Sequence, residues 1–113
     1  MQRDPLVCVE DALMACLLIQ EFTSSINYDS FSDDSRTKAA VERQFEIIGE
    51  ALNRIKQIDE TILAGISNWR QIIGFRNVIA HGYDVIEDKV VWDAVINDIP
   101  VLTGQLQGIL KEI

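Results

Sequence analysis

A single histidine and a nearby arginine give this chain its clearest candidate chemistry. They lie in the segment "RNVIAHGY", residues 76–83, where Arg76 precedes His81 by five residues and Tyr83 follows it by two. Arginine stays charged at neutral pH and binds two phosphate oxygens at once, and histidine has an ordinary pKa that lets it both accept and donate a proton. The pair therefore offers what cleavage of a phosphodiester requires, namely charge stabilisation and a general acid and base.

The spacing of the pair limits how one helix can present it. Five residues of helix turn through about 500°, so Arg76 and His81 point about 140° apart. Asn77 lies one turn before His81, and Tyr83 would lie nearly above Arg76. Two arrangements would bring the arginine and the histidine to one target: unwinding of the last turn before Gly82, or a two-fold dimer that pairs the helix with its copy.

The same residues also have a purely structural interpretation. His81 would then cap carbonyls at the end of its helix, and Tyr83 would pack. Arg76 would pair with a nearby acid, either Asp84 or Glu87. In an arbitrary helical protein this interpretation is the commoner one.

A metal site is not predicted. One histidine with no cysteine near it leaves only carboxylates such as Glu46 and Glu50, which on one helix more often form a solvated face. We therefore expect neither a metal nor another cofactor.

Length and composition predict a single folded domain, residues 1–113. The chain is 48% hydrophobic, so it can bury a core, but it is too short for two domains. Cys8 and Cys16 are separated by about 12 Å on one predicted helix, which no disulfide spans. This cysteine usage favours a reducing cytoplasm. The apolar run 12–19 follows two acids and is too short to cross a membrane.

The first half of the chain is predicted to form two long helices. Asp4 followed by Pro5 begins the first, which continues to about residue 26. The polar stretch 27–35 is predicted as a turn, and Asp34 or Ser35 caps a second helix that fades after residue 58. The apolar stripes are Leu6, Val9, Leu13, Leu17 and Phe22 in the first helix, and Val41, Phe45, Ile48, Leu52 and Ile55 in the second.

The second half is predicted to form two more helices after a loop through Gly65. Ser67 or Asn68 caps the third helix, and Gly82 ends it. The last segment keeps one apolar stripe across Pro100, which predicts one kinked helix rather than two. That stripe consists of Trp92, Val95, Ile99, Leu102, Leu106, Ile109 and Ile113. The predicted fold is therefore all-α, an antiparallel bundle of four main helices joined by short loops.

Two glycines lie inside predicted helices. Gly49 and Gly74 each weaken their helix by about 1 kcal/mol relative to alanine. We expect close packing of helix backbones to compensate at both positions.

Charge is unevenly distributed along the chain. The net charge of −8 argues against nucleic acid as a partner, because phosphate binding uses lysine and arginine. Residues 1–35 carry one base and seven acids, and residues 77–113 carry two bases and six acids, but residues 36–76 carry seven bases and five acids. No pattern of aromatic platforms for reading bases is visible. Any nucleic-acid recognition is therefore expected to be local to the histidine segment, or else the acidic faces serve a partner protein.

Three segments follow one another in a distinctive order. They are "AVERQFEIIGEAL" at 40–52, then Trp69 with "IIGFRNVIAHGYD" at 72–84, then "VVWDAVINDIPVL" at 90–102. Their core is an arginine, four residues, a histidine, one residue and a tyrosine. In this combination, over roughly residues 34–102, the chain resembles the HepT-like branch of the HEPN superfamily.

This resemblance implies a four-helix or five-helix HEPN-type bundle that forms a homodimer, and a metal-independent endoribonuclease whose active site lies at the dimer cleft. Arg76 would bind and polarise the scissile phosphate, His81 would be the acid-base residue, and Asn77 would help to orient them. The family's ribonucleases act as toxins of type VII-like toxin-antitoxin pairs. An MntA-like nucleotidyltransferase antitoxin neutralises them by transferring AMP to the motif tyrosine, here Tyr83, where a bulky anion would block the cleft and repel RNA.

The resemblance also allows a second hypothesis, a non-catalytic subunit. Related proteins have been described as substrate-binding subunits of nucleotidyltransferases. An acidic face would then dock the nucleotidyltransferase, and the cleft would hold that enzyme's substrate without cleaving RNA.

Overall fold

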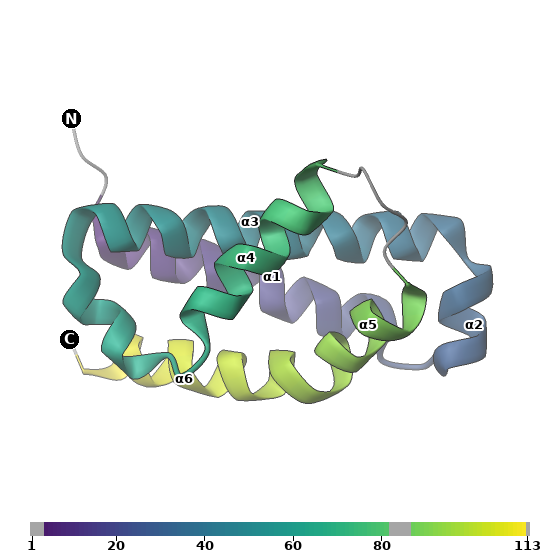
Figure 1. Ribbon diagram of the computed structural model, residues 1–113. Helices are drawn as coiled ribbons and strands as arrows, with labels where there is room; N and C mark the ends of the chain where they lie inside the picture. Colours follow the sequence, from purple (N-terminus) through teal and green to yellow (C-terminus); the bar gives the residue numbers. More distant parts are fainter. Residues whose placement is uncertain (1–3, 82–86, 113) are drawn as a thin grey trace.

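The computed structural model of the protein describes residues 4–81 and 87–112, with only the backbone of residues 80 and 81. These residues form helices and turns without a strand, which confirms the predicted all-α fold. Long helices lie side by side and α4 crosses them obliquely (Figure 1). The elements are α1 (Pro5–Thr23), α2 (Tyr28–Asp33), α3 (Ser35–Asp59), the 3-10 helix η1 (Glu60–Gly65), α4 (Trp69–His81), α5 (Asp88–Asp93), the π-helix η2 (Ala94–Asp98) and α6 (Ile99–Lys111).

Side-chain caps begin α1 and α3 where the sequence predicts them. The Asp4 carboxylate accepts a hydrogen bond from the backbone N–H of Leu6 at 2.9 Å, and Pro5 is the first helical residue. The Asp34 carboxylate accepts from the backbone N–H groups of Arg36 and Thr37. Each cap satisfies donors that have no partner inside the helix.

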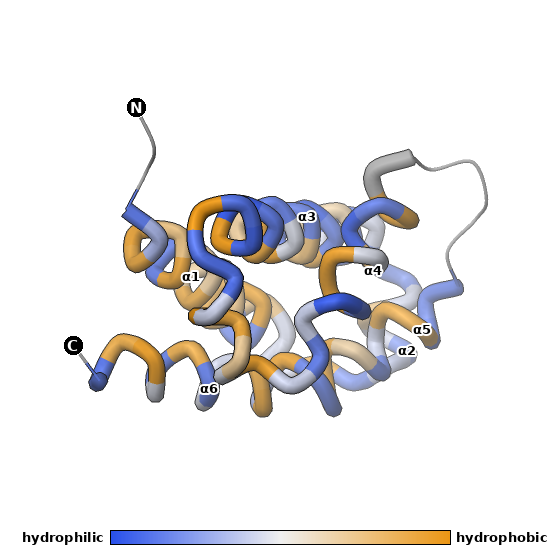
Figure 2. Tube along the Cα trace, turned by 60° about the vertical axis from the view of Figure 1, so that its left-hand side comes forward, coloured by the Kyte–Doolittle hydropathy of each residue, from blue (hydrophilic) through white to orange (hydrophobic). Residues whose placement is uncertain are grey.

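The predicted stripe of α3 is confirmed, because all five of its members are buried. The predicted buried stripe of α1 is wrong at two positions, because Leu17 is 42% exposed and Phe22 is 36% exposed. Apolar residues lie on most sides of α1 (Figure 2), so periodicity did not distinguish its inner face. The buried face instead carries mostly small side chains, which let α3 and α6 pack closely on it: Cys8, Val9, Ala12, Ala15, Cys16 and Ile19.

The stretch 27–35, predicted as a turn, contains the helix α2. Asn27 caps this helix by accepting a hydrogen bond from the backbone N–H of Ser30. Phe31 is fully buried, and its ring centroid lies 5.1 Å from that of Trp92 on α5. One aromatic anchor therefore makes an otherwise polar segment helical, because burial outweighs its local turn preference.

The predicted loop through Gly65 is also helical, since η1 covers it and buries Leu63. α4 follows, and the backbone carbonyl of Asn68 accepts from the N–H of Ile72. Gly82, predicted to end α4, lies outside the described residues.

The path from α5 through η2 to α6 is continuously helical from Asp88 to Lys111, as predicted for this segment. It changes direction near η2 (Figure 1). Pro100 is the second residue of α6 and cannot donate a backbone hydrogen bond, so the turn before it widens into the π-helix η2. The predicted stripe lies inward through Leu106.

Both cysteines are free and buried. Burial raises the pKa of the Cys16 thiol to about 12, which keeps it protonated and unreactive at neutral pH. Within residues 4–81 and 87–112, none of the helices has the length and hydropathy that a membrane crossing requires.

Candidate active site

Arg76 is held where α4 crosses α3. A Cβ atom placed on Gly49 of α3 would lie 2.7 Å from Cγ and 3.0 Å from Cδ of Arg76. No side chain fits in that space, so the aliphatic part of Arg76 rests directly on the backbone of α3. The expected close packing at Gly49 is confirmed, and its partner is the candidate catalytic arginine. The glycine in "EIIGE" therefore positions the candidate site.

Asn77 orients the guanidinium of Arg76. The Nη1 group of Arg76 donates a hydrogen bond to Oδ1 of Asn77 at 2.5 Å. The buried Nε of Arg76 has no hydrogen-bond partner among the described residues. The guanidinium is therefore aimed by a neighbour, yet the described part of the chain does not saturate its donors.

The two members of the predicted pair are not brought together by a local distortion of α4. This helix stays helical through residue 81, so positions 76 and 81 are about 140° apart around its axis. The last turn before residue 82 is not unwound, contrary to one of the two arrangements considered above. The side chain of His81 and all of Tyr83 lie outside the described residues.

Of the two acids expected to pair with Arg76 in the structural interpretation, Glu87 lies among the described residues. No ion pair joins Arg76 to Glu87 among the described residues. Asp84, its other expected partner, lies outside them.

The outward face of α4 carries small and exposed residues. Gly74, Asn77 and Val78 follow the spacing of one helix face, and Val78 is 56% exposed. A Cβ placed on Gly74 would meet nothing within 4 Å. The expected close packing at Gly74 is therefore wrong for the described chain.

Positive charge gathers at the start of α4. The guanidinium of Arg70 lies 4.4 Å from the centroid of the Trp69 ring, and the ammonium of Lys56 lies 5.9 Å from it. These cation-π contacts place two bases of the net-positive middle segment on one surface.

Glu46 and Glu50, the carboxylates considered as metal ligands, form ion pairs along α3. Arg43 pairs with Glu46 at 3.0 Å and with Glu50 at 3.9 Å. No group of three potential ligands is found in the described part of the chain.

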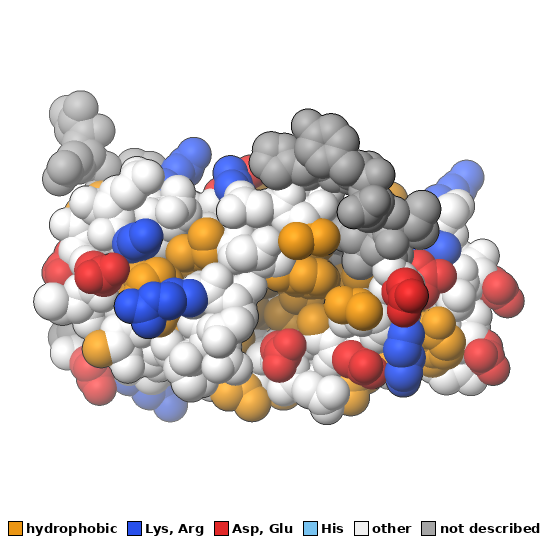
Figure 3. Space-filling view, viewed as in Figure 1, with side chains coloured by type: hydrophobic (Ala, Val, Ile, Leu, Met, Phe, Trp, Pro, Cys, Tyr) orange, Lys and Arg blue, Asp and Glu red, His pale blue; other side chains and the backbone are white. Residues whose placement is uncertain are grey.

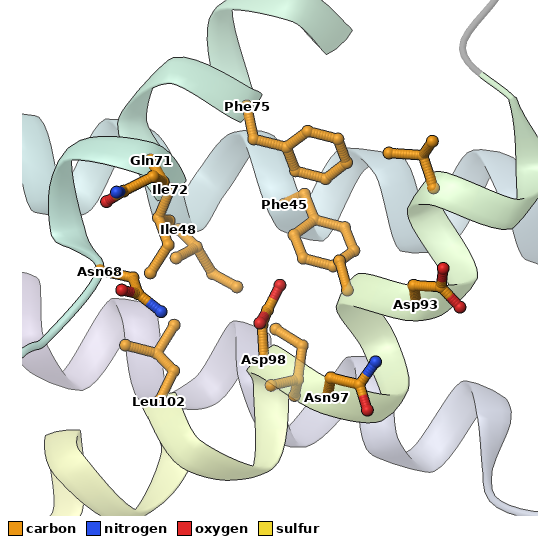
Figure 4. Close-up of a pocket in the computed structure, with 13 residues that line it drawn as sticks. Phe45, Ile48, Asn68, Gln71, Ile72, Phe75, Asp93, Asn97, Asp98 and Leu102 are labelled. Atoms are coloured by element: carbon orange, nitrogen blue, oxygen red, sulfur yellow. The ribbon is translucent and has the colours of Figure 1, made fainter.

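A pocket of about 570 Å³ opens between α3, α4 and the path from α5 to α6, and its lining includes Phe75, the residue before Arg76. Space filling shows an apolar recess with acidic side chains at its margin (Figure 3). The rings of Phe45 and Phe75 meet edge to face in it, with centroids 5.1 Å apart (Figure 4). Residues far apart in sequence form this pocket, so the motif gave no sign of it. Its apolar lining includes Phe45, Ile48, Ile72, Phe75, Ile99 and Leu102, and its polar lining Asn68, Gln71, Asp93, Asn97 and Asp98.

The chain thus combines an all-α bundle with an arginine anchored at a helix crossing and a histidine five residues later on the same helix. It matches the family described as "Ribonuclease HepT-like" over residues 12–109. The chain therefore belongs to the ribonuclease HepT-like family. This membership confirms the resemblance and the expectation of an enzyme of the ribonuclease class.

Relatives in archaea and bacteria agree with this assignment. The chain is 35% identical over 111 residues to "Probable ribonuclease HepT" of Thermococcus cleftensis, covering 98% of this chain and 100% of the relative. It is 32% identical to "Putative RNase MJ0127" of Methanocaldococcus jannaschii, covering 84% of this chain and 78% of that protein. It is 26% identical to "Putative RNase TTE0752" of Caldanaerobacter subterraneus, with 97% of each chain covered. No solved structure gives a significant match.

Proposed function

We propose that this protein is a metal-independent endoribonuclease toxin of a type VII-like toxin-antitoxin pair, with its Arg-x4-His-x-Tyr active site at a homodimer cleft. The observation that carries the proposal is the double anchoring of Arg76. Its aliphatic part rests on Gly49, and its Nη1 group is bonded to Asn77. An arginine with no role beyond the protein surface needs neither the contact with Gly49 nor the hydrogen bond to Asn77. A group that stabilises a transition state, by contrast, must be held in position before the reaction begins.

The chemistry assigned to each residue is proton transfer and charge stabilisation. His81 removes the proton of a ribose 2′-hydroxyl, and the 2′-oxygen forms a bond to the adjacent phosphorus as the bond to the 5′-oxygen breaks. Arg76 neutralises the charge that develops on the phosphate oxygens. A protonated histidine supplies the proton to the leaving 5′-oxygen, so the products carry a 2′,3′-cyclic phosphate and a 5′-hydroxyl.

The proposal includes a homodimer, which the separation of positions 76 and 81 by about 140° around one α4 helix supports. In a two-fold dimer the arginine of one subunit and the histidine of the other share one cleft. The open position beside Gly74 and the exposed Val78 support close approach of two α4 helices. The bases around Trp69 favour the approach of RNA despite the acidic remainder of the surface.

Regulation is assigned to Tyr83, two residues after the histidine. An MntA-like nucleotidyltransferase antitoxin transfers AMP from ATP to the tyrosine hydroxyl and releases pyrophosphate, and the added phosphate repels RNA and competes for Arg76. The proposal places the protein in the cytoplasm, where its RNA substrates and its partner are found.

The first experiment compares cleavage of total cellular RNA in EDTA by the unmodified wild type and by His81→Ala and Arg76→Ala. Arg43→Ala, which removes an exposed arginine that pairs with Glu46, is the matched control. We expect cleavage by the wild type and Arg43→Ala only, and loss of growth arrest by His81→Ala without unfolding. Retained toxicity of folded His81→Ala would contradict the mechanism.

The non-catalytic alternative is supported by the exposed apolar and acidic face of α1. This helix contains no basic residue, and Val7, Met14 and Leu17 are exposed on it beside Glu10. Such a surface suits a docked nucleotidyltransferase. In this case the purified protein, shown by intact mass to lack AMP on Tyr83, would cleave no RNA and would co-purify with the nucleotidyltransferase.

A further inference from the structure

The pocket beside α4 has the lining of a site for a flat, uncharged ring. Its interior is apolar and includes the half-buried Phe75, against which a ring can stack. None of its described lining residues is a lysine, an arginine or a histidine, and two are aspartates. A phosphate is therefore disfavoured inside the pocket. Its volume of about 570 Å³ lies within the range of small-molecule sites.

Asp98 supplies a hydrogen-bond acceptor at this pocket. It is the last residue of the π-helix η2 that precedes Pro100, and π-turns of this kind occur frequently at functional sites. Its carboxylate points into the pocket (Figure 4). The carboxylate of Asp98 makes no hydrogen bond or ion pair with another side chain within residues 4–81 and 87–112, whereas the carboxylate of Asp93 on the same rim pairs with Lys89 at 3.2 Å.

A carboxylate selects among nucleobases by the donors that each base presents. Guanine has two adjacent N–H donors on its Watson–Crick edge, N1–H and the 2-amino group, and both can bond to one carboxylate, as a guanidinium does. Adenine and cytosine each present an amino group beside a ring acceptor, which a carboxylate repels. Uracil has a single N–H between two carbonyl oxygens. The side-chain amides of Gln71 and Asn97, also on the lining, can serve the remaining polar atoms of the base.

We propose that this pocket binds a guanine base of the RNA substrate, stacked against Phe75 and hydrogen-bonded to Asp98. The inference rests on the proposed ribonuclease function, because it assigns the pocket to the same substrate. Phe75 and Arg76 are consecutive on α4, and Ile48 and Gly49 are consecutive on α3, so the pocket lining and the contact that holds Arg76 come from neighbouring positions on the same two helices, about 100° apart around each axis. Cleavage is therefore directed to sites near a guanosine.

The test is a titration of the purified protein with guanosine, adenosine, cytidine and uridine, which does not depend on catalysis. Binding is followed by the NMR shifts of the Gln71 and Asn97 side-chain amides. We expect guanosine to bind at least about tenfold more tightly than the others, the discrimination typical of a bidentate base contact. Asp98→Asn abolishes that preference. Asp33→Asn, which removes the same charge from an exposed carboxylate outside the pocket lining, retains it.

Three results would overturn the inference: equal binding of all four nucleosides, an unchanged preference in Asp98→Asn, or no binding of guanosine. Amide shifts that follow protein concentration and ignore guanosine would assign the pocket to a second copy of the chain instead. Mapping of cleavage ends in total RNA separates the two proposals. Guanosine binding without RNA cleavage would refute the proposed ribonuclease function and support a guanine site in the pocket. RNA cleavage without guanosine binding would support the ribonuclease function and refute the guanine site.

Discussion

Replacement of Gly49 by alanine tests whether the contact between α3 and Arg76 is functional. The added Cβ would lie 2.7 Å from Cγ and 3.0 Å from Cδ of Arg76, closer than carbon atoms approach in proteins. The side chain of Arg76 must therefore move, because the backbone of α3 is fixed by the buried stripe on either side of Gly49. A displacement of about 1 Å at a positioned group can cost about 100-fold in rate.

The effect on stability is expected to be much smaller than the effect on rate. Alanine gains about 1 kcal/mol over glycine in a helix interior, while overpacking costs about 1–3 kcal/mol. The two terms leave Gly49→Ala between neutral and about 2 kcal/mol less stable. We expect kcat on a fluorogenic RNA to fall by about 100-fold while the protein stays folded.

Gly104→Ala is the matched control for this substitution. Gly104 lies inside α6, is exposed, and an added Cβ there meets nothing within 4 Å. This variant should be stabilised by about 1 kcal/mol in urea unfolding and should keep full activity. Wild-type activity in folded Gly49→Ala would refute the idea that Gly49 positions Arg76 for catalysis.

Three further substitutions test the fold, its pH dependence and the dimer. Phe31→Ala removes a fully buried ring that contacts Trp92 and should cost about 3–5 kcal/mol in urea unfolding; a loss below 1 kcal/mol would mean that α2 is not anchored this way. The hydroxyl of Thr37 donates to Asp34 and, with backbone N–H groups, lowers the pKa of that carboxyl below its ordinary value. The contribution of the Asp34 carboxylate to the free energy of unfolding is therefore complete above its ordinary pKa and is lost as the pH falls through its pKa in the folded protein. In Asp34→Asn the melting temperature should therefore fall less steeply as the pH is lowered. An unchanged dependence of the melting temperature on acidic pH would contradict this. Gly74→Leu should raise monomer stability by about 1 kcal/mol but shift the mass measured by light scattering from dimer to monomer, and a stable Gly74→Leu dimer would remove α4 from the interface.

Local chemistry determined much of the helical framework. The caps at Asp4 and Asp34 act over one turn, so they are visible in the sequence and correctly mark where α1 and α3 begin. The stripe of α3, and the stripe of the last segment through Leu106, were predicted correctly because polar residues separate the apolar ones at helical spacing. The same periodicity failed for α1, where apolar residues on several sides left the inner face to be chosen by the close approach of α3.

In the candidate site, too, some features are visible in the sequence and others depend on how the helices pack. The sequence contains the arginine, the histidine and the tyrosine at motif spacing, and it matches the ribonuclease HepT-like family over residues 12–109. Only the tertiary structure places Gly49 beneath Arg76 and points the Asp98 carboxylate into the pocket that Phe75 lines. These contacts join residues from different helices, and their geometry depends on where α4 crosses α3 and on how the π-turn before Pro100 bends the last helix. No local preference of the chain encodes a crossing point, because it results from the packing of the whole core.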